Sequence, residues 1–210
     1  MRVIQTIEPG YYYHIYNCGI NGTNLFNGSD NYEYFMGLYE KYIYKVADTF
    51  AWVLMPNHFH ALIRIKDVED IVENINPERV QNPFGVCDAE KITKYVTQQF
   101  SNLFNSYAQA FNKRNKRHGS LFEKPFKRKR VDQANYFKNL VLYIHNNPVH
   151  HGFCQHPIEY PWSSYLSCIS IKPTKLRREA VIGWFDGMAN FKTMHNEKVE
   201  VIELEKWFEI

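Results

Sequence analysis

Two short apolar segments on either side of Pro56-Asn57 constrain the fold more than any other feature of the sequence. They cover residues 49–55 and 58–65, and a turn-forming pair between two such segments predicts a β-hairpin. Successive side chains of a strand point to opposite faces, so His58 and His60 in the second segment share one face. The opposite face of that strand carries the intervening apolar residues, Phe59, Ala61, Ile63 and Ile65.

A strand and a helix are predicted before this hairpin. Residues 11–20 are rich in aromatic and β-branched side chains and end at Asn21-Gly22, which predicts a first strand. Over residues 32–46 the apolar side chains recur every three or four positions, and this spacing predicts an amphipathic helix. Asp30 stands just before it as the expected N-cap.

Four further segments follow the hairpin. Residues 67–88 contain two Asn-Pro pairs and are expected to have little regular structure. Helical spacing of apolar residues predicts a long helix over 92–111 and another over 137–144 that ends before Pro148. Between these helices, residues 121–131 predict a short, irregular strand that carries positive charge.

The resulting order is strand, helix, strand, strand, helix, strand and a further helix, which is typical of a ferredoxin-like α+β sandwich. In that fold the first and third strands are neighbours at the centre of an antiparallel sheet, and two helices cover one face. His58 and His60 would point to the face that those helices leave open. If Tyr13 and Ile15 point into the core, three residues of the first strand share that open face: Tyr12, His14 and Tyr16.

The length of 210 residues suits one domain with an extension. We expect a domain over residues 1–152 and a C-terminal extension over 153–210. Hydrophobic residues make up 45% of the chain, enough to build a core. The sequence has no run of eighteen apolar residues and no signal-peptide pattern, and its four cysteines form no C-x-x-C pair. These features favour a cytoplasmic protein that is not bound to a membrane.

Positive charge is concentrated in one segment, although the net charge is only +3. A cluster of this kind is typical of a surface that binds a polyanion such as DNA, and it is also compatible with a solvated basic loop. Glu123 is the only acidic residue among the basic ones, which are Lys113, Arg114, Lys116, Arg117, Lys124, Lys127, Arg128, Lys129 and Arg130.

Four sequence blocks surround the candidate site. Residues 55–63 hold the pattern of histidine, bulky hydrophobe and histidine, whose two neighbouring imidazoles suit a shared metal ion. Histidines two positions apart also occur in strands as ordinary hydrogen-bonded residues, so the surrounding blocks carry the interpretation. These blocks are Tyr13–Gly19, Gly119–Lys127 and Tyr143–Val149, the last followed by Gly152.

In this order the blocks resemble the HUH endonuclease superfamily, and within it the single-tyrosine transposases of the REP-associated branch. The resemblance implies that Tyr143 is the nucleophile and that His58, His60 and Asn147 hold Mg²⁺ or Mn²⁺. It also implies cleavage and rejoining of single-stranded DNA through a covalent 5′-phosphotyrosine, with DNA hairpins selecting the site. The resemblance allows a homodimer as well.

The sequence departs from the family at two positions and leaves alternatives open. The insertion-sequence branch typically has glutamine where Asn147 stands, and Cys18 replaces a residue that is commonly arginine. Tyr136, two helical turns before Tyr143, is the rival nucleophile. Two other classes of function stay open: a domesticated protein that binds hairpin DNA without cutting it, and an unrelated metal hydrolase that uses His58 and His60.

Overall fold

A four-stranded antiparallel sheet forms the centre of the protein. The computed structural model describes residues 5–74 and 89–197. The order of strands in the sheet is β2-β3-β1-β4, so the first and third strands are the central pair, as the sequence predicts. The strands are β1 (Tyr12–Cys18), β2 (Ala47–Met55), β3 (His58–Ile65) and β4 (Lys127–Val131).

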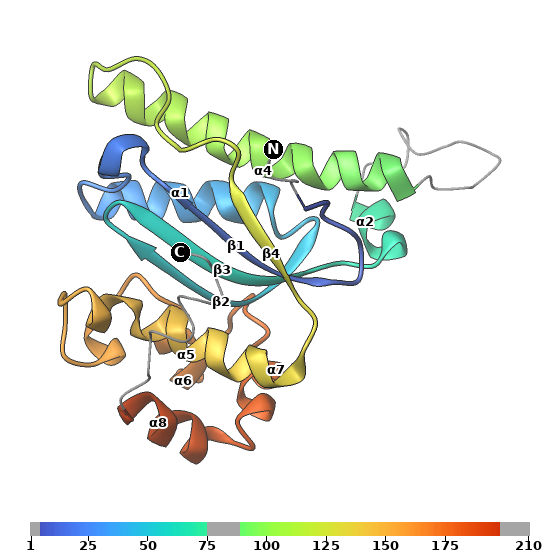
Figure 1. The fold of residues 1–210 in the computed structure, drawn as a ribbon, viewed down its shortest axis with the longest axis vertical. Helices are drawn as coiled ribbons and strands as arrows, with labels where there is room; N and C mark the ends of the chain where they lie inside the picture. Colours follow the sequence, from blue (N-terminus) through green and yellow to red (C-terminus); the bar gives the residue numbers. More distant parts are fainter. Residues whose placement is uncertain (1–4, 75–88, 198–210) are drawn as a thin grey trace.

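Helices α1 (Ser29–Tyr42) and α4 (Ala89–Arg114) cover one face of the sheet (Figure 1). Their apolar sides meet the strand residues that face them, including Tyr13, Ile15 and Phe59, in one buried core. The prediction that Asp30 caps the first helix is wrong: the N-cap is Gly28, and Asp30 lies within the first turn. A short helix, α2 (Val68–Asn74), occupies the start of the predicted irregular connection. The rest of that connection lies outside the described residues.

The face that α1 and α4 leave open is covered by the helix that carries Tyr143, as expected, and also by the C-terminal extension. Helix α5 (Ala134–His150) crosses it, and the C-terminal helices lie on the same side (Figure 1). Phe50, Leu62 and Val131 from the strands pack there with the helices in a second buried core. The C-terminal helices are α6 (Tyr165–Ile169), α7 (Arg178–Trp184) and α8 (Met188–Asn196), and two 3₁₀ turns, Ile20–Gly22 and Pro157–Glu159, complete the described elements.

Helix α5 continues through Pro148 to His150 instead of ending before the proline. A proline inside a helix removes one hydrogen bond to the carbonyl four residues earlier. Here only two helical residues follow it, and the His151 amide still donates to the Asn147 carbonyl at 3.1 Å. The loss of helical hydrogen bonding at Pro148 is therefore confined to the last turn, and Asn147 stays in the helix.

The C-terminal segment also covers the outer edge of β2. The Leu54 amide donates to the Trp162 carbonyl, and the Ser164 amide donates to the Trp52 carbonyl, both at 2.9 Å. Further along the strand, the Arg177 amide donates to Thr49. An edge strand with unpaired backbone groups can pair with another chain. The extension occupies these groups of β2.

Candidate active site

The central strands place three histidines together beneath α5. In the register of the β1–β3 pair, Tyr16 lies opposite His60 and Cys18 lies opposite His58. His14, on the same face of β1, shares a hydrogen bond of 2.9 Å between its Nε2 and Nδ1 of His60. His14 and His60 point to the face of the sheet that α5 covers, and both are almost fully buried.

Helix α5 brings Tyr143 and Asn147 to these histidines. The ring of Tyr143 lies edge-on to His60, with 5.4 Å between the ring centroids. One turn later, Oδ1 of Asn147 lies 3.0 Å from Nε2 of His58. Residues four apart on a helix lie over one another, so both side chains reach the same patch of the sheet. The structure therefore brings together all four residues that the family resemblance implies.

The hydrogen-bond partners of His58 fit a site for a cation. Its Nδ1 lies 2.7 Å from Oδ1 of Asn57, and its Nε2 lies 3.0 Å from Oδ1 of Asn147. Burial lowers the pKa of His58 to about 4, so the ring is neutral at pH 7 and carries a single N–H. It can donate to only one of the two oxygens. When Nδ1–H donates to Asn57, the Nε2 lone pair and the Asn147 oxygen face each other as two potential metal ligands.

The neighbouring imidazoles are held neutral in the same way. Burial, with a smaller contribution from His14, holds the pKa of His60 well below its ordinary value. Burial and the nearby Lys129 lower the pKa of His14 to about 3. Neutral imidazole is the form that ligates metals. Among the described residues, no group of three or more His, Cys, Asp or Glu is arranged to hold a metal ion, and the implied ligand set here is two imidazoles and an amide.

Tyr143 packs directly against the histidines, a contact that its position in the sequence could not show. It is only 3% exposed. Its ring contacts His60 and also lies 6.4 Å from His14. Tyr136 precedes it by two turns, which places its Cα about 10 Å further along the helix axis. Tyr136 is half-buried and packs against the second core.

His151 is a site neighbour that sequence reasoning missed. It follows Asn147 by one turn, at the C-cap of α5, and its ring centroid lies 5.1 Å from that of His58. The spacing of four residues between Tyr143, Asn147 and His151 is the signal that could have revealed it.

The pairing of β4 with β1 places the basic residues of this strand alternately on the two faces of the sheet. Lys127 lies opposite Tyr16 and Lys129 lies opposite His14, so this pair is on the face of the histidines. Arg128 lies opposite Ile15 on the face covered by α4. The sequence predicted this strand to be basic but did not distinguish its two faces.

The remaining basic residues lie away from the histidines. Lys113 and Arg114 form the last turn of α4, and Lys116 and Arg117 follow it. Several ion pairs tie the basic segment to acidic neighbours: Arg114 pairs with Asp30, Lys127 with Glu123, and Arg130 with both Glu8 and Asp132.

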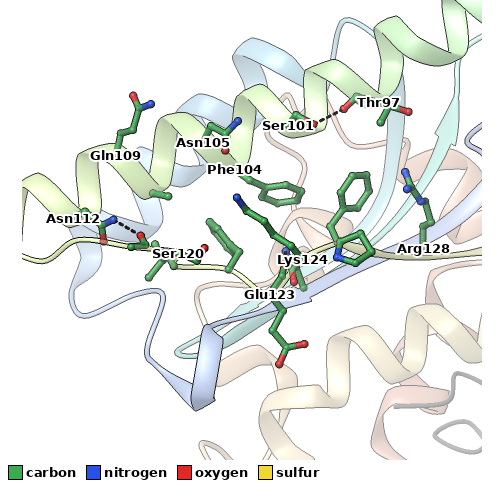
Figure 2. A pocket seen from close by; sticks show the side chains of 17 residues that line it. Thr97, Ser101, Phe104, Asn105, Gln109, Asn112, Ser120, Glu123, Lys124 and Arg128 are labelled. Carbon is green, nitrogen blue, oxygen red and sulfur yellow. Dashed lines mark hydrogen bonds between the residues drawn. The ribbon is translucent and has the colours of Figure 1, made fainter. Parts of the chain in front are cut away.

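A pocket of about 830 Å³ lies between α4 and the segment before β4 (Figure 2). Polar side chains of α4 line one wall: Thr97, Ser101, Asn105, Gln109 and Asn112. Residues 119–126 form the other wall, with Phe126 half-buried beneath the Arg128 guanidinium at 4.4 Å. Phe122 also lines the pocket but is only 4% exposed, because its ring packs against Phe104.

Behind α5, a buried polar chain joins three parts of the fold. The carbonyl of Phe191 accepts a hydrogen bond from Nδ1–H of His195 at 2.7 Å, so Nε2 of a neutral His195 accepts from Nδ1–H of His145 at 2.9 Å. In turn, Nε2 of His145 accepts from the Ser164 hydroxyl, whose oxygen accepts from the Trp52 amide. Burial lowers the pKa of both histidines, that of His195 to about 4. All groups in this chain are satisfied when both rings are neutral.

The fold and the site together define the class of protein that the chain resembles in structure. A sheet with two histidines on its central strand, facing a helix that carries a tyrosine, is the arrangement expected for the HUH transposase fold. A solved structure of a REP-associated tyrosine transposase bound to a REP hairpin is similar to this chain, with a TM-score of 0.55 and 16% sequence identity. The match covers 82% of this chain and 88% of that chain. The described residues therefore share the fold of that transposase.

Comparisons based on the sequence alone identify no further similar protein. No family model matches the chain, and no curated protein matches it. The likeness is one of structure, and it agrees with the resemblance in the four sequence blocks.

Proposed function

We propose that this protein is a metal-dependent transesterase that cleaves and rejoins single-stranded DNA through a covalent 5′-phosphotyrosine, as a transposase of the REP-associated kind. The observation that carries the proposal is the meeting of Tyr143 and Asn147 of α5 with His58 and His60 of β3 in one cluster. The shared fold with a hairpin-bound tyrosine transposase supports it.

In this proposal His58, His60 and the Asn147 amide oxygen hold a divalent cation, Mg²⁺ or Mn²⁺. Two neutral nitrogen ligands and one oxygen ligand leave coordination positions for water and phosphate. The bound cation would neutralise charge on the non-bridging phosphate oxygens.

The protein's own residues account for the rest of the reaction. The Tyr143 hydroxyl forms a bond to phosphorus as the bond to the 3′ oxygen breaks, and the proton lost by the phenol is matched by one gained at that oxygen. The phosphodiester energy is kept in the phosphotyrosine, so attack by a 3′-hydroxyl reverses the step and joins strands without ATP.

Cleavage polarity tests the proposal directly. With Mg²⁺ or Mn²⁺ and labelled single-stranded DNA from the flanks of the gene, we expect the protein to be joined to the 5′ phosphate of one product and the other product to end in a free 3′-hydroxyl. Denaturing gels that follow each end label separately measure both. Protein linked to a 3′ phosphate would contradict this mechanism.

The DNA is proposed to approach the site across the edge of the sheet at β4. Lys127 and Lys129 lie on the face of the histidines, where they would contact the phosphates nearest the cut. On the other face, the pocket with Phe126 and Arg128 offers a ring, amides and a cation to unpaired bases. The more distant cations of the basic segment would add contacts that do not depend on sequence.

This arrangement predicts that the lysines of β4 contribute more to DNA binding than lysines elsewhere on the surface. Replacing Lys127 and Lys129 by alanine should weaken binding of single-stranded DNA and flatten the slope of log affinity against log salt by roughly 0.7 per lysine, because fewer counterions are released. Fluorescence anisotropy over a salt series measures both quantities. The matched control replaces Lys41 and Lys45, which are exposed and outside the basic segment but remove the same charge. Equal slopes for the two double variants would mean that β4 does not contact DNA.

One observation favours a second candidate function. Tyr143 is nearly fully buried, so its hydroxyl has to become accessible before it can attack DNA. A protein that binds hairpin DNA without cutting it would not need this movement. The two candidates differ in one result, since only the transesterase yields an adduct in the labelled-DNA experiment.

Where the protein acts follows from the same proposal. Within residues 5–74 and 89–197, no helix has both the length and the apolar composition to cross a bilayer. We propose the cytoplasm, where chromosomal DNA is available to it.

A further inference from the structure

His14 contacts the implied metal site although the family resemblance assigns it no role. It lies on the central strand β1 and is fully buried. Its ring is nearly parallel to that of His60, at 20° with 5.1 Å between centroids, and its Nε2 is 2.9 Å from Nδ1 of His60. These two nitrogens share one proton between them, so this hydrogen bond has a direction.

The direction decides what His60 can do. A neutral imidazole has one N–H and one lone pair. If His14 donates, the proton of His60 is on Nε2, and His60 has no lone pair left outside this hydrogen bond. If His60 donates from Nδ1, its Nε2 carries a lone pair that is free to bind a cation. Only the second arrangement, with His14 as the acceptor, is compatible with His60 as a ligand.

We infer that His14 is a positioning residue, which accepts the Nδ1–H of His60 and so fixes the tautomer and ring orientation that His60 needs to bind metal. The inference rests on the proposed metal site. Metal-ligating histidines generally donate their second ring N–H to an acceptor, most often a carboxylate or a backbone carbonyl. Here the acceptor is another imidazole.

The surroundings of His14 hold this acceptor in place. Its strand pairs with β3 on one side and β4 on the other, so the backbone at His14 is bonded within the sheet. The ring also stacks on Tyr16, with 4.7 Å between centroids at 22°, and meets the edge of Tyr143 at 6.4 Å. A rigid acceptor loses little conformational freedom when His60 binds a cation, which favours affinity.

Two substitutions separate the acceptor from the bulk of the ring. His14→Gln places an amide oxygen near the position of Nε2, so it keeps an acceptor for His60. His14→Leu fills a similar volume without one. Titration calorimetry with Mn²⁺ should show metal affinity reduced by roughly 10- to 100-fold in His14→Leu and largely restored in His14→Gln. Thermal unfolding of the metal-free proteins measures how far each substitution affects folding.

The outcomes distinguish this inference from the proposed function. If the wild-type protein binds no Mn²⁺, the proposed metal site fails. If the wild type binds and His14→Leu binds equally well, or if both substitutions weaken binding to the same degree, the acceptor role of His14 is wrong. Nitrogen-15 NMR of the metal-free wild type gives a test that no folding defect can affect. The proton of His60 is expected on Nδ1, and finding it on Nε2 would overturn the inference.

Discussion

Replacing Tyr143 by phenylalanine is expected to abolish the covalent protein–DNA adduct and leave metal and hairpin binding intact. The substitution removes only the phenolic oxygen, which is the proposed nucleophile. The ring remains to pack edge-on against His60, so the cluster of histidines should keep its shape. Adduct yield on denaturing gels, measured beside Mn²⁺ affinity and hairpin affinity, gives all three quantities for the same preparation.

Tyr136→Phe is the matched control because it removes the same atom from the same helix two turns away. It should form adduct at the wild-type level. If Tyr143→Phe forms the adduct and Tyr136→Phe does not, then Tyr136 is the nucleophile. Adduct formation by both variants would place it elsewhere in the chain.

Removing the proposed ligands should produce the opposite pattern, in which the nucleophile is present but metal binding fails. His58→Ala and His60→Ala each delete a nitrogen ligand, and we expect Mn²⁺ affinity and adduct yield to fall together by more than the 10- to 100-fold that is typical for residues behind the ligands. Asn147→Ala deletes a neutral oxygen ligand. Its loss of affinity should be smaller, and a higher Mn²⁺ concentration should restore part of the adduct.

Asn146→Ala is the control for the amide. Asn146 precedes Asn147 and is also buried, but its side chain donates to the Leu142 carbonyl within α5. It should bind Mn²⁺ like the wild type. If Asn147→Ala binds Mn²⁺ as well as Asn146→Ala does, the third ligand is another group, and the nearby His151 is the first candidate.

The parts of the fold that the sequence predicts are those governed by local periodicity. The alternation in β3 placed His58 and His60 on one face, and the structure confirms that this face meets α5 while Phe59 and Ile63 enter the first core. The order of strands in the sheet follows from the order of strands and helices along the chain. The roles of Tyr143 and Asn147 came from the resemblance, and they stay predictions.

The parts that could not be predicted depend on contacts between distant segments. The C-terminal helices are five, seven and nine residues long, too short for a clear apolar periodicity. They are held by packing on the second face, as when the Trp184 ring stacks on Phe50 and Phe137. The hydrogen-bond partners of His145 could not be predicted, because Ser164 and His195 lie far from it in the sequence. The division of the chain at residue 152 stays a prediction.

The two edges of the sheet have consequences for how copies of the protein meet in solution. Along β2 the backbone groups are engaged by the C-terminal segment, whereas β4 is the opposite edge strand and reads Lys-Arg-Lys-Arg-Val. Two copies that extended their sheets through β4 would set cations against cations, and like charges directly opposite each other destabilise a strand pair. A nucleic acid backbone meets no such repulsion. The edge that disfavours self-association is thus the one proposed to contact DNA, and we expect any homodimer to form through another surface.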